Sequence, residues 1–224
     1  GTLYLDTGKQ LEVNWLFLIY LLNTIGSETL TIRGSEKSLY GKFFEKLVLG
    51  SLLHTLDFSF ANQGQSALSE KTFWLSSNTD RGRESDATLL YEFGRGIRFD
   101  IGFIGRGNSE ISLDKVSRYR REIEIGGKQW FMGTIIIVDR VGRRSKIVKL
   151  AEEIDGRIVQ MSSGYWPRQV AEMLRNYVGF QHPILEMDPD DIESYLHGKL
   201  QDAPLSTFIN YVIEDSDDDD DEDE

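Results

Sequence analysis

The chain has 224 residues, of which 40% are apolar and 11% aromatic, and its formal net charge is -12. A chain of this length and apolar content can bury a sizeable core, so we expect one elaborated domain rather than two small ones. It contains no cysteine, which excludes a disulfide scaffold, a thiolate zinc site and a cysteine nucleophile.

The negative charge is concentrated at the end of the chain. Ten of the 37 acidic residues lie in the last eleven positions, which leaves 27 acidic residues against 25 basic ones before them. Like charges this dense repel and have no core to bury, so we expect residues 214–224 to form a disordered acidic tail. The tail either solvates the protein or competes with nucleic acid for a basic surface.

The longest apolar run, Trp15 to Leu22, is too short for the roughly 20 residues that cross a bilayer. We therefore expect no membrane segment and a cytoplasmic location. We treat residues 1–34 as an N-terminal segment. After it, Ser35 can cap a long helix that reaches about Asp57, because apolar residues recur near helical spacing. The stretch from Asn62 to Asp86 is rich in Ser, Asn, Asp and Gly, with aromatic residues at Phe73 and Trp74, and predicts a loop or a partly ordered excursion.

Three short strands are expected next: Thr88 to Phe93, Ile97 to Ile104, and Glu110 to Leu113, with glycine-rich turns between them. Asp114 can cap a following helix, and Phe131 to Val138 is typical of a buried strand. The core order is thus α-β-β-β-α-β.

The remaining chain predicts alternating elements. These are a helix over 144–155, a strand from Arg157 to Met161, a helix opened by Pro167 and closed by Gly179, a helix at Asp188-Pro189, and a weak last helix from Ser206 to Ile213. Alternating strands and helices imply parallel pairing. The predicted fold class is α/β, with a central mixed β-sheet flanked by helices.

Two acidic residues mark the central hairpin. Side chains alternate between the faces of a strand, so Asp100 lies opposite to the apolar face of Phe99 and Ile101. Glu110 opens the next strand. If the two strands pair across the turn, both carboxylates face one cleft. The alternative interpretation is that both residues only solvate an exposed face of the hairpin.

Paired carboxylates of this kind suit phosphodiester cleavage. Their hard oxygen atoms bind Mg²⁺, and the metal activates a water molecule and stabilises charge on the phosphate and the leaving oxygen. Spacing alone does not distinguish this chemistry from a solvated hairpin.

The core order, with one acid on the second strand and another opening the third, matches the arrangement of the PD-(D/E)XK phosphodiesterases. Two segments of the sequence resemble type II restriction endonucleases of the CfrBI type within that superfamily. They are Ile97-Arg98-Phe99-Asp100-Ile101-Gly102-Phe103-Ile104-Gly105 and Asn108-Ser109-Glu110-Ile111-Ser112-Leu113-Asp114-Lys115-Val116-Ser117-Arg118-Tyr119. The resemblance runs over roughly Ser35 to Phe180, and it implies a restriction-endonuclease-like core.

The resemblance also implies site residues. It places Asp100 and Glu110 as metal ligands, with a lysine expected two residues after the second acid. Ser112 stands at that position, so either Lys115 supplies the amine or Ser112 serves in its place. Glu45, on the helix before the sheet, is a further candidate metal ligand; otherwise it is a solvated helix residue.

Basic residues suited to phosphate contacts follow the site. They are Lys115, Arg118, Arg120, Arg121, Arg140, Arg143, Arg144, Lys146, Arg157 and Arg168. Any one of them can instead belong to a solvated helix face. The histidines His54, His182 and His197 lack metal-ligand spacing, and we expect structural or surface roles for them.

These observations predict a nuclease domain over 35–213 that acts as a sequence-specific double-strand DNA endonuclease with Mg²⁺. A homodimer is expected, because palindromic duplex sites reward two-fold symmetry. The alternatives are a structure-selective repair or recombination nuclease, and a non-catalytic protein that binds DNA or another partner.

Overall fold

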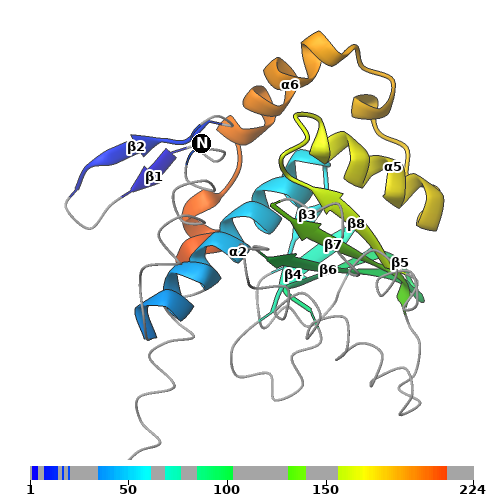
Figure 1. Ribbon diagram of the computed structural model, residues 1–224, viewed down its shortest axis with the longest axis horizontal. Helices are drawn as coiled ribbons and strands as arrows, with labels where there is room; N and C mark the ends of the chain where they lie inside the picture. Colours follow the sequence, from blue (N-terminus) through cyan, green and yellow to red (C-terminus); the bar gives the residue numbers. More distant parts are fainter. Residues whose placement is uncertain are drawn as a thin grey trace, which may run out of the picture. The chain divides into compact units, whose positions relative to one another are not determined.

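The computed structural model describes residues 2–4, 8–14, 17, 20, 35–61, 69–76, 85–102, 131–139 and 156–210 (Figure 1). The chain divides into two compact units. The first comprises Gly1–Phe58, Leu75–Arg83 and Asp188–Glu224, and the second comprises Ser59–Trp74 and Glu84–Met187. The predicted segments 1–34, 35–213 and 214–224 stay a prediction.

The second unit is built on a six-stranded sheet with the order β3-β4-β5-β6-β7-β8. β5 and β6 are antiparallel, whereas β6, β7 and β8 run parallel to one another, so the sheet is mixed as the sequence predicts. The strands are β3 (Ser59–Phe60), β4 (Thr72–Leu75), β5 (Ala87–Glu92), β6 (Arg95–Gly102), β7 (Phe131–Val138) and β8 (Gly156–Gln160).

The turn between β5 and β6 contains Gly94 at φ 81°, a conformation that glycine adopts without a steric penalty. Along β6 the side chains alternate as expected: Ile97, Phe99 and Ile101 are fully buried on one face. Register pairs Phe99 with Ile135 and Ile101 with Ile137, so this apolar face continues onto β7.

Helix α5 (Trp166–Val178) packs on β7 and β8, as Figure 1 shows in yellow beside the sheet. Pro167 lies in its first turn, and Gly179 ends it in the left-handed conformation, as the sequence predicts. Its buried residues recur at helical spacing and include Val170, Leu174 and Val178. They form the apolar stripe that faces the sheet.

The first unit contains the two helices α2 (Ser35–Thr55) and α6 (Pro189–Gln201), which contact each other. Their packing is supported by an ion pair from Lys199 to Asp57, 2.5 Å between Nζ and Oδ1. Residues 205–210 form a further helical turn, whose Phe208 is buried. The unit also contains an antiparallel pair, β1 (Thr2–Tyr4) with β2 (Gln10–Glu12). The helices expected from Ser35 and at Asp188-Pro189 are thus confirmed as α2 and α6.

One expected loop is wrong. Phe73 and Trp74 lie on β4 rather than in a loop, and β4 pairs in parallel with β3. Phe73 is fully buried, and its carbonyl accepts a hydrogen bond from the Ala61 amide at 2.8 Å. A four-residue strand surrounded by polar residues carries too little periodicity to be recognised, because its burial depends on partners elsewhere in the chain.

Other expectations lie outside the described residues. These are the strand from Glu110 to Leu113, the helix from Asp114, the helix over 144–155, the acidic tail, and the rest of the expected loop at 62–68 and 77–84. None of the described helices is both long and apolar enough to cross a bilayer.

Candidate active site on strand β6

Asp100 lies near the end of β6, and only 3% of its surface is exposed. Its register partner on β7 is Ile136. Burying a carboxylate is costly unless its charge is compensated, and strongly buried acids are over-represented at functional sites. The interpretation of Asp100 as a residue that solvates an exposed hairpin is therefore wrong.

The face of the sheet that carries Asp100 is more polar than the opposite one. Register places Arg98 opposite Thr88 on β5 and opposite Thr134 on β7, and both threonines are buried. Gly102, two residues beyond Asp100, lies on the same face. No described atom lies within 4 Å of the position that a Cβ would take there. Asp100 is thus followed on this face by a position without a side chain.

Asp86 is a second acidic residue at this site, and the sequence patterns did not single it out. Its Oδ2 accepts a hydrogen bond from the Ile101 amide at 2.9 Å, and its own amide donates to the Phe99 carbonyl at 3.0 Å. Both contacts join Asp86 to the neighbours of Asp100. The only signal in the sequence was its position at the start of a strand that pairs with β6.

The other predicted site residues are not brought together with Asp100 by the described structure. Glu110, Ser112 and Lys115 lie outside the described residues. Glu45 lies on α2, which belongs to the first unit, and is partly exposed between the buried Phe44 and Lys46. Burial of a lysine at position 46 was not anticipated from the sequence.

The described residues alone do not complete a metal site. Among them, no three histidine, aspartate or glutamate side chains are grouped so as to hold a metal ion. Glu110, the other expected ligand, lies outside the described residues. The donor chemistry nevertheless fits a hard divalent cation, because carboxylate oxygens are the ligands that Mg²⁺ prefers.

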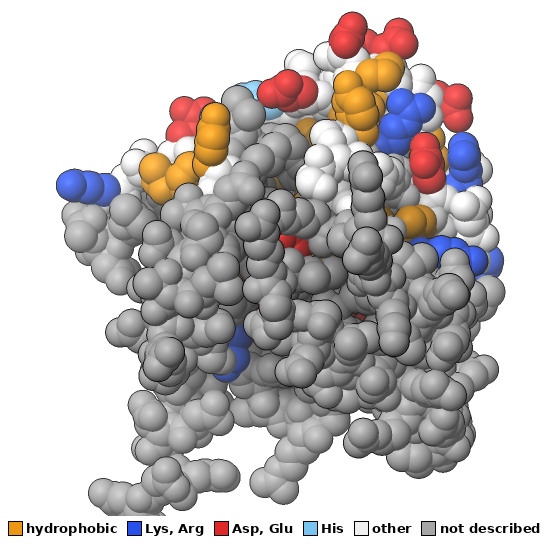
Figure 2. All heavy atoms as spheres, in the orientation of Figure 1, with side chains coloured by type: hydrophobic (Ala, Val, Ile, Leu, Met, Phe, Trp, Pro, Cys, Tyr) orange, Lys and Arg blue, Asp and Glu red, His pale blue; other side chains and the backbone are white. Residues whose placement is uncertain are grey.

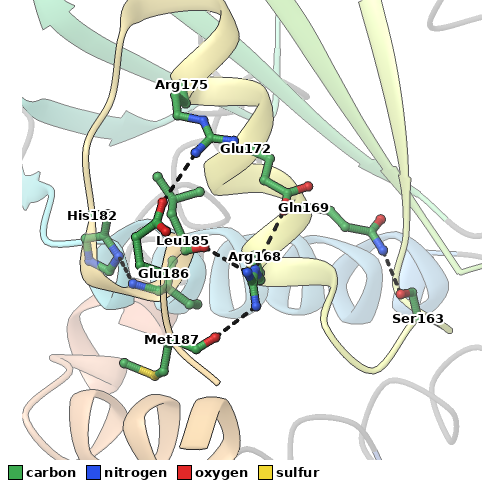
Figure 3. A network of polar contacts seen from close by, with 10 residues as sticks. Ser163, Arg168, Gln169, Glu172, Arg175, His182, Leu185, Glu186 and Met187 are labelled. Atoms are coloured by element: carbon green, nitrogen blue, oxygen red, sulfur yellow. Dashed lines mark hydrogen bonds and ion pairs between the residues drawn. The ribbon is translucent and has the colours of Figure 1, made fainter. Parts of the chain in front are cut away.

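Arg168 has a different role from the phosphate contact considered above. Figure 3 shows its guanidinium donating hydrogen bonds to the carbonyls of Leu185, at 2.8 Å, and Met187, at 2.9 Å. It also lies 3.6 Å from Glu172 on the same helix. These contacts hold the segment after α5 against the first turn of the helix, so Arg168 stabilises the fold.

His182 has the structural role expected for the isolated histidines. It is buried, its ring stacks on Phe180 at 5.4 Å between centroids, and its Nδ1 accepts a hydrogen bond from the Ile184 amide at 3.4 Å. This last contact caps the short helix η1 (Pro183–Leu185) and is drawn in Figure 3.

On the face drawn in Figure 2, the described residues carry both signs of charge. In Figure 2, acidic, basic and apolar side chains are interspersed among the described residues that reach this face. Of the basic residues proposed for phosphate contacts, Arg157 and Arg168 alone fall in the described part of the chain. Its surface in this view is therefore not a continuous basic one.

The comparisons with known proteins agree on one family. The family model described as CfrBI restriction endonuclease matches residues 2–146, a range that includes Glu45, Asp100, Glu110, Ser112 and Lys115. The type II restriction enzyme CfrBI of Citrobacter freundii is 49% identical over 192 residues, which cover 85% of this chain and 53% of that enzyme. The chain thus spans about half the length of this curated relative. No solved structure matches.

Proposed function

The chain belongs to the CfrBI restriction endonuclease family, and we propose that it is a sequence-specific endonuclease that cuts double-stranded DNA. The observation that carries the proposal is the buried carboxylate of Asp100 on the central strand of the mixed sheet. This is the position where the resemblance in the sequence implies the first catalytic acid. The chain spans 53% of the Citrobacter freundii enzyme, so the activity of that enzyme supports the proposal for this chain.

The proposed cofactor is Mg²⁺, held by Asp100 and Glu110, with Glu45 as a further candidate ligand. When bound, the ion would lower the pKa of a water molecule and stabilise negative charge on the phosphate. The chain's own part is to supply carboxylate oxygens at fixed positions. The buried surroundings of Asp100 favour this role, because a carboxylate with little access to bulk water gains most from an adjacent cation.

The role of the lysine expected in this superfamily is proposed for Lys115 or for Ser112. An ammonium group near the scissile phosphate would stabilise developing charge or orient the attacking water. Lys115 follows Glu110 by five residues and can supply that group, whereas Ser112 occupies the usual lysine position with a neutral hydroxyl. The two possibilities are separated by mutation.

The proposed partners are duplex DNA and a second copy of the chain. A sequence-specific enzyme that cuts both strands of a palindrome is served by two symmetry-related sites, so a homodimer is part of the proposal. A cytoplasmic location follows from access to DNA that enters the cell.

The test is digestion of unmethylated plasmid and phage DNA with Mg²⁺, followed by mapping of the fragment ends. Discrete fragments with one common end sequence support the proposal. A ladder or smear, or cutting confined to junctions and flaps, favours a structure-selective nuclease instead. DNA that is bound but never cut, at any concentration of Mg²⁺ or Mn²⁺, favours the non-catalytic alternative.

A further inference from the structure

We propose that Asp86 is a positioning residue that fixes the orientation of Asp100 toward the metal; this inference rests on the proposed function. The starting point is the register of the β5–β6 hairpin. Ala87 lies opposite Phe99, so the preceding residue, Asp86, comes beside Asp100. Residues directly opposite on antiparallel strands lie on the same face and close to each other.

The two hydrogen bonds of Asp86 bracket Asp100. The Phe99 carbonyl, which accepts from the Asp86 amide, belongs to the peptide unit that precedes the Asp100 Cα. The Ile101 amide, which donates to the Asp86 Oδ2, belongs to the peptide unit that follows it. Asp86 therefore holds both peptide planes that border the Asp100 Cα, and these planes set the direction of its Cα–Cβ bond.

Asp86 is itself held in place. Next to it, the hydroxyls of Ser85 and Thr88 form a hydrogen bond at 3.0 Å, and both residues are buried. This contact closes the segment around Asp86 and limits its movement. Asp86 thus lies between two hydrogen-bonded residues of its own segment and is itself bonded to Phe99 and Ile101, the two neighbours of Asp100.

Such a residue matters because ligand geometry controls metal affinity. Outer residues that orient a metal ligand typically change affinity or activity by about 10- to 100-fold when they are removed. The carboxylate of Asp86 is used as a hydrogen-bond acceptor in this role, and its charge is secondary. Asparagine can take over the acceptor role through its Oδ1, whereas alanine cannot.

The experiment compares Asp86→Ala and Asp86→Asn in two readouts. The first is Mn²⁺ binding to the full chain without DNA, by titration calorimetry. The second is the Mg²⁺ concentration that gives half-maximal cleavage of plasmid DNA. We expect Asp86→Ala to weaken Mn²⁺ binding and raise the required Mg²⁺ by about 10-fold or more, while Asp86→Asn stays near wild type.

Each other outcome overturns the proposal. A folded Asp86→Ala protein with wild-type metal affinity shows that the contacts do not position a ligand. An Asp86→Asn protein as impaired as Asp86→Ala shows that Asp86 acts through its charge, as a ligand itself. If Asp86→Ala does not fold, Asp86→Glu replaces it, because the longer side chain displaces the acceptor; wild-type Mn²⁺ affinity in that variant contradicts the proposal.

Asp100→Asn is measured in parallel to separate this inference from the proposed function. If wild type itself leaves DNA intact, the proposed function fails, and if Asp100→Asn cuts DNA like wild type, the metal-binding role of Asp100 fails and the positioning role of Asp86 fails with it. If Asp100→Asn is inactive while Asp86→Ala behaves like wild type, only the positioning role fails.

Discussion

Tyr177 of α5 lies directly against Gly133 of β7. A Cβ atom at position 133 would approach the Tyr177 Cε1 to 2.5 Å, closer than carbon atoms pack in proteins. The absence of a side chain at 133 is therefore what allows α5 to lie this close to the parallel part of the sheet. Residue 133 is in the same strand as the partners of Asp100, so this contact also supports the strand beside the candidate site.

Gly133→Ala is expected to destabilise the protein by about 1–3 kcal/mol, the usual cost of overpacking a core. Urea unfolding, followed by circular dichroism, measures the effect. Gly198→Ala is the matched control: it lies on α6, where no described atom is within 4 Å of the added Cβ, and alanine is the better helix former. Equal midpoints for wild type and Gly133→Ala would show that α5 is not packed this closely.

Arg168→Ala is expected to lower the free energy of unfolding by roughly 2–3 kcal/mol, because two carbonyls lose a charged hydrogen-bond donor. Arg175→Ala on the same helix is the control. Arg175 makes an exposed ion pair with Glu186 at 3.7 Å, of the kind that contributes about 0–1 kcal/mol. If both variants lose the same free energy of unfolding, the hydrogen bonds of Arg168 drawn in Figure 3 do not contribute the stability expected of them.

His54 makes stability depend on pH. Burial on α2, and then the nearby Lys199 ammonium, hold the pKa of His54 below its ordinary value of 6.5, although Asp57 and Asp202 act in the opposite direction. The unfolded chain therefore binds more protons at this position as the pH falls below 6.5. The stability that comes from neutral His54 is present above pH 6.5 and is lost as pH falls toward the lower, folded-state pKa.

The measurement is urea unfolding at pH 7.5 and at successively lower pH, for wild type and His54→Gln. Wild type is expected to lose more stability than the variant on going below pH 6.5, because glutamine does not titrate. Parallel curves for the two proteins would contradict the assigned environment of His54.

Much of the fold was predictable because its signals are local. β7 is rich in apolar residues, Pro167 and Gly179 mark the ends of α5, and the alternation along β6 separates Asp100 from Phe99 and Ile101. Each of these features requires only neighbouring residues. The candidate acid Asp100 was found in the same way, as a polar residue in an apolar strand.

What could not be predicted depends on contacts between distant residues. The four-residue β4 exists because β3 and β5 flank it. The hydrogen bond from Ile101 to Asp86 spans fifteen positions and depends on the register of the hairpin, which composition does not reveal. Burial of Lys46 on α2 likewise follows from tertiary packing rather than from residue type.

Two variants, Lys115→Ala and Ser112→Ala, test which residue takes the role of the catalytic lysine. If Lys115 supplies it, Lys115→Ala loses cleavage by at least about 100-fold, the low end for general acid–base catalysis, and Ser112→Ala retains most activity. The reverse pattern assigns the role to Ser112. Single-turnover cleavage of a plasmid at saturating Mg²⁺ is the measurement, with Lys9→Ala, a change at an exposed lysine, as the control. Wild-type rates in both variants would contradict both assignments.

The central claim, a metal-dependent nuclease centred on Asp100, is tested most directly by incubating unmethylated phage DNA with wild type and with Asp100→Asn, each with and without Mg²⁺. Asparagine has nearly the same volume as aspartate but lacks its charge, so the variant should keep its Tm and its binding to DNA. We predict discrete fragments from wild type with Mg²⁺ and none from Asp100→Asn. Equal cutting by the two proteins, or intact DNA with wild type under every condition, would contradict the claim.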